Sequence, residues 1–258
     1  MRDMTLDFSP IACYVPSDMP AWLCPLIAFL IGSIPFGLLI ARRQGIDIRA
    51  HGSGNIGATN VLRVVGKQHG IACFLLDFLK GFLPVLVVLN LIQIEGKSVI
   101  IPLSFLDPWT VTYALDDQFH AQLIQILTGL LAILGHNYSP WVGFRGGKGI
   151  ATSAGVLLGL MPFAVILLVL VWGLTFLLTR YVSVASVLTA VVLPIMTHLG
   201  ARFHRGDDGL SLWEAGTWNK PLFAFTVIIG VMAVWKHRAN LKRLAAGTEP
   251  RHQRRQRP

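Results

Sequence analysis

The sequence predicts an all-α, polytopic integral membrane protein with seven membrane segments. The chain of 258 residues is 53% hydrophobic and only 14% charged, whereas a soluble domain carries about 25% charged residues. The apolar residues form long blocks, and a membrane helix needs about 20 predominantly apolar residues in a row. The formal net charge of +9 comes from lysines and arginines between these blocks and in a C-terminal tail. It therefore fits cytoplasmic loops and argues against a nucleic-acid partner.

Each expected segment is a run of apolar residues bounded by charged or turn-forming residues. The longest block, 150–179, would form a helix of about 45 Å, which is longer than the hydrocarbon core of about 30 Å. Pro162 lies inside this block and interrupts the helical hydrogen bonds, so we expect a short broken helix followed by a returning one. The seven segments are expected at 22–41, 70–92, 121–138, 150–160, 162–179, 182–199 and 222–235.

The distribution of positive charge supports this division and predicts an orientation. With seven segments, the N-terminus lies outside and the C-terminus is cytoplasmic, and 16 lysines and arginines then face the cytoplasm against five outside. Such a bias is typical of cytoplasmic loops. A single span over 150–179 would instead place the basic tail outside. We expect one membrane-embedded domain over 1–248, a basic disordered tail at 249–258, and irregular outer loops at 93–120 and 201–221.

A glycine-rich string, HGSGNIGATNVLR at 51–63, is the first candidate site. Glycines allow backbone amides to approach a ligand and to turn toward an anion, and an arginine one helical turn further on can bind phosphate with two hydrogen bonds. The string is neither a Walker loop nor a dinucleotide fingerprint. The alternative is a tight turn that caps a helix. The candidate ligand residues are Gly52, Ser53, Gly54, Asn55, Gly57, Thr59, Asn60 and Arg63.

A second string, GFRGGKGIATSAG at 143–155, has the same character. Four of its glycines surround Arg145 and Lys148, and the string leads into the short broken helix. Lysine binds phosphate as a point charge. The alternative is a flexible loop whose cations only follow the positive-inside rule, but four glycines within seven residues favour a binding site. The candidates are Gly146, Gly147, Lys148, Gly149 and Thr152.

Further polar residues are expected on the same membrane face. His237 and Asn240 are three residues apart at the end of the last segment, so they share one helix face. An interfacial or capping role is the alternative for His237. Ser183 and Ser186 begin the sixth segment, where a helix cap is the alternative role.

No residue pattern supplies a protein nucleophile or a metal site. The sequence has no H-x-x-x-x-D dyad, no G-x-S-x-G elbow and no cluster of carboxylates and histidines, and its three cysteines lack C-x-x-C spacing. Asp77 and Lys80, inside the second segment, are expected to form a structural ion pair, because charges within a membrane are costly and usually paired. We therefore expect neither a metal nor a cofactor.

Seven short motifs occur in order and cover nearly the whole chain. They are GSIPFG at 32–37, GSGNIGATNV at 52–61, LDFLKG at 76–81, GHNY at 135–138, GFRGGKGIAT at 143–152, RYVSVAS at 180–186 and HRANLKRL at 237–244. With these motifs the chain resembles the bacterial acyl-phosphate:glycerol-3-phosphate acyltransferase family. The N-terminal extension, the two long outer loops and the basic tail depart from the family pattern.

The resemblance implies an enzyme of phospholipid biosynthesis. It would transfer a fatty acyl group from acyl phosphate to the 1-hydroxyl of sn-glycerol 3-phosphate, giving lysophosphatidic acid and phosphate. The implied location is the bacterial cytoplasmic (inner) membrane, with a multi-pass fold in contact with membrane lipid and an active site facing the cytoplasm. A soluble enzyme would supply the acyl phosphate. Acyl phosphate is an activated anhydride, so positioning and charge stabilisation can replace a protein nucleophile.

The expected roles follow from the motifs. The 52–60 loop would hold the acyl-phosphate phosphoryl group, Arg63 and Lys148 would bind the phosphate of glycerol 3-phosphate, and the polar residues of the last two motifs would contact the glycerol. Catalytic roles are expected for Ser53, Asn60, Arg63, Lys148, His237 and Asn240. Substrate binding is expected for Gly52, Gly54, Asn55, Gly57, Thr59, Gly146, Gly147, Gly149, Thr152, Ser183 and Ser186.

Two other functions remain open from the sequence. A membrane phosphotransferase or phosphatase acting on lipid head groups would also need anion-binding loops, but usually with metal-binding carboxylates or a phosphate-accepting histidine. Asp47 is the only carboxylate in the loops of the motif face. The other alternative is a transporter or channel for an organic anion.

Overall fold

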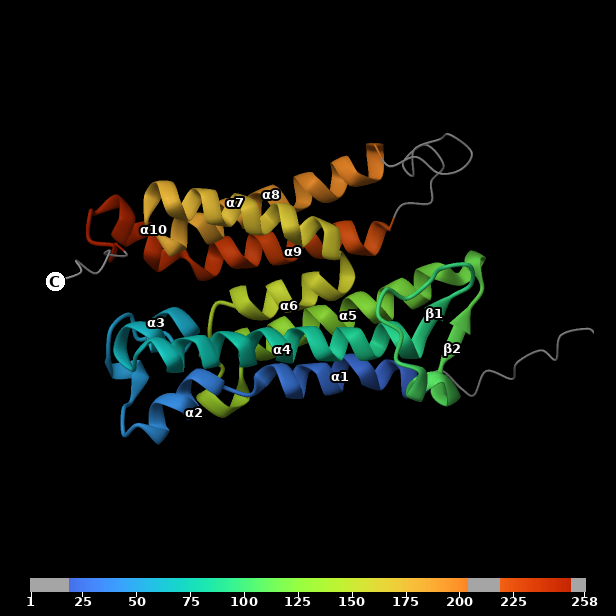
Figure 1. Cartoon of the computed structure of the whole chain (residues 1–258), viewed down its shortest axis with the longest axis horizontal. Coiled ribbons are helices and arrows are strands. Elements are labelled where there is room, and N and C mark those ends of the chain that lie inside the picture. Colours follow the sequence, from blue (N-terminus) through green and yellow to red (C-terminus); the bar gives the residue numbers. More distant parts are fainter. Residues whose placement is uncertain (1–18, 204–218, 252–258) are drawn as a thin grey trace, which may run out of the picture.

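The computed structural model describes residues 19–203 and 219–251, which are almost entirely helical (Figure 1). The α-helices are α1 Met19–Ser33, α2 Phe36–Arg43, α3 Ala58–Val64, α4 Lys67–Leu91, α5 Gln118–Asn137, α6 Ile150–Leu160, α7 Pro162–Thr179, α8 Val182–Phe203, α9 Lys220–Lys236 and α10 Arg238–Ala245. Short 3₁₀ turns lie at Ile48–Ala50, Ser104–Trp109, Leu115–Asp117 and Pro140–Val142.

The long helices form two layers (Figure 1). In the first layer α1 packs on α5 and α4 packs on α6, whereas in the second α8 packs on both α7 and α9. The layers are joined where α6 leads into α7 and where α5 contacts α9. The short helices α2, α3 and α10 gather at one end of the molecule, and both glycine-rich strings lie at this end.

The break at Pro162 is confirmed. Helix α6 ends at Leu160 and α7 begins at Pro162, because proline is well placed at the first turn of a helix but not in its interior. Five helical stretches of the described residues are long and apolar enough to cross a membrane, or six if α9 and α10 count as one bent span. Helix α6 has 11 residues, about 16 Å. Seven crossings and the orientation of the termini stay predictions.

The first expected segment differs from a single helix. It is divided at Ile34 and Pro35 into α1 and α2, since proline has no backbone N–H to continue the helical ladder. At the break, the carbonyl oxygen of Ile34 accepts hydrogen bonds from the Phe36 amide at 3.1 Å and from Lys80 Nζ at 2.7 Å. Lys80 also forms the expected ion pair with Asp77 at 2.8 Å, and both side chains are buried. The pair therefore stabilises the bend.

Close packing of α4 on α6 depends on small residues. A Cβ atom at Gly155 would lie 2.1 Å from the carbonyl oxygen of Phe78, and one at Gly81 would lie 2.2 Å from that of Thr152. Only glycine allows the two backbones to approach so closely, as is common between membrane helices.

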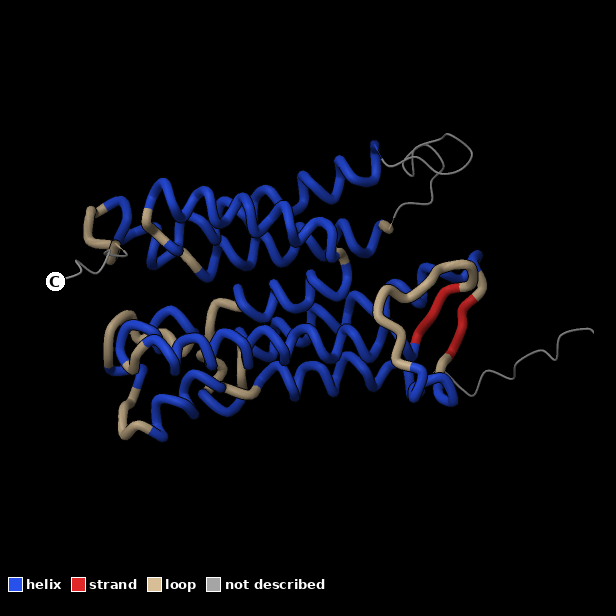
Figure 2. Tube along the Cα trace, in the orientation of Figure 1, coloured by secondary structure: helices blue, strands red, loops and turns tan. Residues whose placement is uncertain are grey.

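The expectation of an irregular loop at 93–120 is wrong. Two short parallel strands, β1 Ile92–Ile94 and β2 Val111–Tyr113, pair in this region (Figure 2). Asn90 anchors the connection, because its side chain donates to the Ile101 carbonyl at 3.1 Å and accepts from the Leu103 amide at 2.7 Å. Of the other expected outer loop, 201–203 belong to α8 and 220–221 to α9; residues 204–218 lie outside the described residues.

Candidate active site

One cavity of about 700 Å³ receives residues from both glycine-rich strings and from the junction of α9 and α10. Ser53, Lys148 and His237 all line it, so segments far apart in sequence meet at one end of the molecule. The expected site residues that line the cavity are Ser53, Asn55, Gly57, Thr59, Asn60, Arg63, Lys148, Gly149, Ser183, Ser186, His237 and Asn240.

The side chain of Asn60 holds the first glycine-rich string in shape. It is buried at the start of α3 and donates to the carbonyl oxygens of His51 and Asn55 at 3.0 and 2.9 Å. Its Oδ1 accepts from the Ser53 amide at 2.9 Å, and Asn55 Oδ1 accepts from the Gly57 amide at 2.8 Å. Two of the amides that were expected to face phosphate are therefore paired within the loop. Asn60 thus positions the loop, which offers the cavity the side chains of Ser53, Asn55, Thr59 and Arg63.

The second string is held against the end of α5. The Gly147 amide donates to the His136 carbonyl at 3.1 Å, and a Cβ at Gly147 would lie 2.1 Å from His136 Nε2. Glycine is therefore needed for contact with the imidazole. This packing aims Lys148 into the cavity, where its Nζ donates to Asn240 Oδ1 at 2.5 Å.

The ammonium group of Lys148 is in a setting that favours loss of its proton. Burial lowers the pKa of Lys148 to about 8, because removal from water penalises the charged form. Glu249 acts in the opposite direction, while Arg243 and Arg63 lower the pKa further. A bound phosphate would counter this by stabilising the cation.

Glu249 organises the polar wall of the cavity. Its Oε1 accepts from Asn240 Nδ2 at 2.7 Å and from Ser183 Oγ at 2.9 Å. Its Oε2 accepts from Arg243 Nε at 2.9 Å. Burial alone would raise the pKa of Glu249, but these three hydrogen bonds lower it overall. Lys148, Asn240 and Glu249 thus form one continuous chain of hydrogen bonds.

His237 lies where α9 meets α10. Its Nδ1 is 2.8 Å from the carbonyl oxygen of Ala233. A carbonyl can only accept, so we assign the hydrogen of the neutral imidazole to Nδ1, which leaves Nε2 as an acceptor. His237 lines the cavity and is buried, so it can accept a hydrogen bond from a substrate hydroxyl.

Positive charge dominates the polar part of the cavity. The cationic residues that line it are Arg63, Lys148, Arg180, Arg243 and Arg251, and the carboxylates are Asp77 and Glu249. Both carboxylates already have cationic partners, Lys80 and Arg243 respectively. The arrangement is suited to phosphate groups, each of which carries more than one negative charge near neutral pH.

The other part of the cavity is apolar. Phe74 and Ile71 of α4 face Trp172 and Phe176 of α7 across it, and Leu62 of α3 adds to the lining. The rings of Trp172 and Phe176 stack with centroids 5.2 Å apart. Apart from Leu62, this lining is provided by α4 and α7, which are long and apolar enough to cross a membrane, so it suits a hydrocarbon chain.

Five residues expected to bind substrate do not line the cavity. They are Gly52, Gly54, Gly146, Gly147 and Thr152. The first two have positive φ angles of 61° and 68° and shape the turn before α3. Thr152 is fully buried and faces α4 next to Gly81. These residues thus have packing roles, and we omit them from the proposed set of ligands.

The disordered tail was predicted to begin at residue 249, and this starting point is wrong. Glu249, Pro250 and Arg251 line the cavity, whereas 252–258 lie outside the described residues.

The sequence did not indicate that Glu249, Arg243, Asp77 and His136 line the cavity. A single carboxylate just after an otherwise basic helix was the available signal for Glu249. Among the described residues, no group of three or more His, Cys, Asp or Glu side chains is arranged to hold a metal ion.

Comparisons with known proteins relate the chain to glycerol-3-phosphate acyltransferases. The profile of a family described as glycerol-3-phosphate acyltransferase matches residues 22–247. The glycerol-3-phosphate acyltransferase of Geobacter sulfurreducens is 40% identical over 227 residues, which are 87% of this chain and 94% of the relative. That of Aquifex aeolicus is 38% identical over 234 residues, which are 90% of this chain and 100% of the relative.

Solved structures share the fold. A crystal structure of PlsY (YgiH), an integral membrane glycerol 3-phosphate acyltransferase in its glycerol 3-phosphate form, superposes with a TM-score of 0.70 at 33% identity, covering 91% of this chain and 96% of that chain. The lysophosphatidic acid form of that protein gives a TM-score of 0.68.

Proposed function

Because the chain belongs to the glycerol-3-phosphate acyltransferase family, we propose that it transfers a fatty acyl group from acyl phosphate to the 1-hydroxyl of sn-glycerol 3-phosphate. The products are lysophosphatidic acid and inorganic phosphate. The observation that carries the proposal is the composition of the cavity, in which a cationic polar part adjoins an apolar part lined from α4 and α7. Such a cavity matches two phosphorylated reactants, one of which bears a hydrocarbon chain.

Glycerol 3-phosphate binds in the cationic part. Arg63 and Lys148 hold its phosphate, since a guanidinium provides paired donors and an ammonium a point charge. Asn240, fixed between Lys148 and Glu249, contacts the glycerol together with Ser186. His237 Nε2 accepts a hydrogen bond from a glycerol hydroxyl, and this contact orients the attacking oxygen.

Acyl phosphate binds beside the 52–60 loop. Ser53, Asn55 and Thr59 point polar side chains at its phosphoryl group, and Asn60 holds the loop that carries them. The acyl chain lies between Phe74 of α4 and Phe176 of α7. The carbonyl carbon is thereby placed near the glycerol hydroxyl, which is the positioning effect that makes a bimolecular reaction effectively intramolecular.

The reaction needs no acyl-enzyme. The 1-hydroxyl oxygen attacks the carbonyl carbon, a new C–O ester bond forms, and the C–O bond to phosphate breaks. The leaving phosphate takes the hydroxyl proton. While Arg63 and Lys148 hold glycerol 3-phosphate, the other arginines that line the cavity stabilise the negative charge that grows on the oxygens of the leaving phosphate.

The proposed setting is the bacterial inner membrane, with the cavity facing the cytoplasm. The charge bias of the sequence supports this orientation, and a soluble enzyme on the cytoplasmic side supplies the acyl phosphate. Both glycine-rich strings and the α9–α10 junction lie at the same end of the molecule (Figure 1), as this orientation requires.

The test is an assay of the purified protein with acyl phosphate and glycerol 3-phosphate, with and without a chelator, and with acyl thioesters as alternative donors. We expect lysophosphatidate to form from acyl phosphate alone, at a rate unaffected by the chelator. Chelator-sensitive turnover of lipid head groups would show a phosphotransferase instead. Uptake of the anion into vesicles without any acyl transfer would show a transporter.

A further inference from the structure

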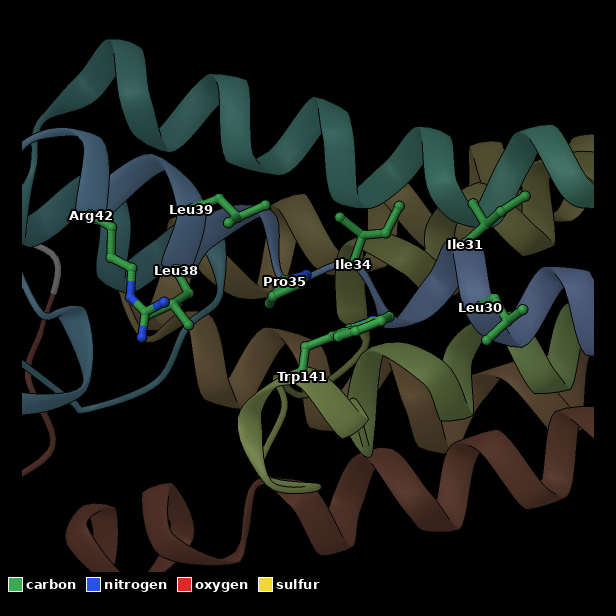
Figure 3. Close-up of a pocket in the computed structure, with 8 residues that line it drawn as sticks. All are labelled: Leu30, Ile31, Ile34, Pro35, Leu38, Leu39, Arg42 and Trp141. Carbon is green, nitrogen blue, oxygen red and sulfur yellow. The ribbon is translucent and has the colours of Figure 1, made fainter.

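A second concave surface lies away from the active cavity, at the break between α1 and α2. It is a groove of about 510 Å³ lined by Leu30, Ile31, Ile34, Pro35, Leu38, Leu39, Arg42 and Trp141 (Figure 3). None of these residues lines the active cavity. The groove exists because the chain bends at Pro35, so that α2 does not continue the line of α1.

The groove is apolar along most of its length and cationic at one end. Figure 3 shows Leu30 and Ile31 at one end and Arg42 at the other, with Trp141 beside Ile34 and Pro35. Leu30, Leu39 and Trp141 are exposed at 58%, 44% and 67%. Because α1 and α2 together form a candidate membrane span, we place the exposed faces of Leu30 and Leu39 against the bilayer, with Trp141 beside them in the groove.

The length of the groove matches the depth of one leaflet. A straight helix over residues 30 to 42 would extend about 18 Å at 1.5 Å per residue, and the bend at Pro35 shortens this length; half of a hydrocarbon core of about 30 Å is about 15 Å. Arg42 lies in the last turn of α2, at the same end of the molecule as α3 and α10 (Figure 1). An acyl chain lying against Ile31 and Leu39 would therefore place its head group at the level of Arg42.

The charge of Arg42 is available to that head group. Among the described residues, none forms an ion pair with Arg42. The nearby Asp47 forms its ion pair with Arg49 at 3.0 Å. Hydrogen bonds from Arg49 lower the pKa of the Asp47 carboxyl most, and the charge of Arg42 adds a smaller lowering. Trp141 forms one side of the groove, and its indole is held in place because its Nε1 donates to Ser33 Oγ at 2.8 Å. An indole with one polar edge is typical of the membrane interface.

We propose that this groove binds an anionic glycerophospholipid from the leaflet on the active-site side, with an acyl chain in the apolar part and the phosphate on Arg42. A phosphate diester accepts hydrogen bonds from a guanidinium, and a lipid without net negative charge lacks the electrostatic part of this attraction. The bound lipid would brace the bend at Pro35.

The experiment compares the full chain in detergent with two matched variants. Arg42→Gln removes the cation of the groove. Arg43→Gln removes a cation from the same helical turn that is also exposed and does not line the groove. Retention of dioleoyl phosphatidylglycerol or dioleoyl phosphatidylcholine is counted by native mass spectrometry, and each variant is first shown to have a cooperative thermal unfolding transition.

We expect wild type and Arg43→Gln to retain phosphatidylglycerol about fivefold better than phosphatidylcholine, and Arg42→Gln to lose this preference. Leu39→Trp, which fills the groove, should lower retention of both lipids. Phosphatidylglycerol should raise the unfolding temperature of wild type and not that of Arg42→Gln. Equal retention of the two lipids by wild type, or equal loss in both arginine variants, would overturn the proposal. Displacement by inorganic phosphate without any effect of Leu39→Trp would show a simple anion site instead.

Discussion

Lys148 is the residue on which the proposed chemistry depends most. It is the cation of the second glycine-rich string, it lies in the cavity, and its hydrogen bond to Asn240 aligns it with the wall made by Glu249. Its role differs from that of Asn60, whose amide is occupied by the first loop. Lys148 has donors left for a substrate, because its ammonium carries three.

Replacement of Lys148 by alanine should remove most of the turnover. Loss of one preorganised charge-stabilising donor lowers catalysis by about 10²–10³-fold, and we expect a loss of this size in kcat/KM for glycerol 3-phosphate. Lys67→Ala is the matched control, because Lys67 is exposed and does not line the cavity. Near-normal activity of Lys148→Ala in correctly folded, membrane-inserted protein would refute the assigned role.

The pKa of Lys148 predicts a pH dependence. The protonated form binds phosphate, and this form is dominant in the free enzyme below a pH of about 8. Above that value kcat/KM, which reports the free enzyme, should fall tenfold per pH unit. Lys148→Arg should keep whatever activity it has to higher pH, since a guanidinium stays protonated. A wild-type profile that is flat between pH 7 and 10 would contradict this assignment.

At the scale of single residues, the sequence indicated which polar side chains line the cavity better than it indicated which glycines serve for packing. Ser53, Lys148 and His237 were recognised because cationic or polar groups followed glycines or closed a segment. The packing glycines, such as Gly147, were misassigned, because sequence does not show whether a missing Cβ makes room for a ligand or for a histidine ring. Glu249 was missed because a single carboxylate after a basic helix does not by itself show that the chain folds back onto α8 and α10.

Two prolines define the elements that shape the site and its surroundings. Pro162 divides an apolar block too long for one span, and this excess length made the break predictable. Pro35 divides a block of ordinary length, so the bend between α1 and α2 could not be inferred. The pair of strands at Ile92–Ile94 and Val111–Tyr113 was hidden for a different reason, since its pairing joins residues about 20 positions apart.

The buried ion pair of Asp77 and Lys80 in α4 should stabilise the fold only while both charges are present. Lys80→Met leaves the buried Asp77 carboxylate without its cation and removes the hydrogen bond to Ile34. We expect a loss of about 3–5 kcal/mol in the free energy of unfolding. The double variant Asp77→Asn with Lys80→Met should be more stable than Lys80→Met. A double variant that is less stable than the single one would contradict the proposed coupling.

The close packing of α4 against α6 should not accommodate a side chain in place of a glycine at the contact. Gly155→Ala would place its Cβ 2.1 Å from the carbonyl oxygen of Phe78, so we expect a loss of roughly 1–3 kcal/mol, as for other overpacked cores. Gly173→Ala is the control, because nothing lies within 4 Å of its added Cβ. Thermal unfolding in detergent measures both. Equal unfolding temperatures of the two variants would show that the contact is less tight than described.

At the scale of the whole molecule, two layers of membrane helices enclose a cavity that neither layer forms alone. α4 and the first loop supply one wall, while α7, α8 and the α9–α10 junction supply the other. The sequence predicted that the polar motifs would share one end, because the charge bias assigned their loops to one membrane face. It did not predict which residues meet across the layers, since that depends on helix packing rather than on local pattern.

The central claim is that acyl phosphate and glycerol 3-phosphate occupy this cavity together and react directly. Two-substrate initial-rate kinetics with the purified protein test it, with the rate measured over a grid of both concentrations. We predict double-reciprocal lines that intersect, as a ternary complex requires. Parallel lines, together with a burst of phosphate in the absence of glycerol 3-phosphate, would instead show a covalent acyl-enzyme and would contradict the account.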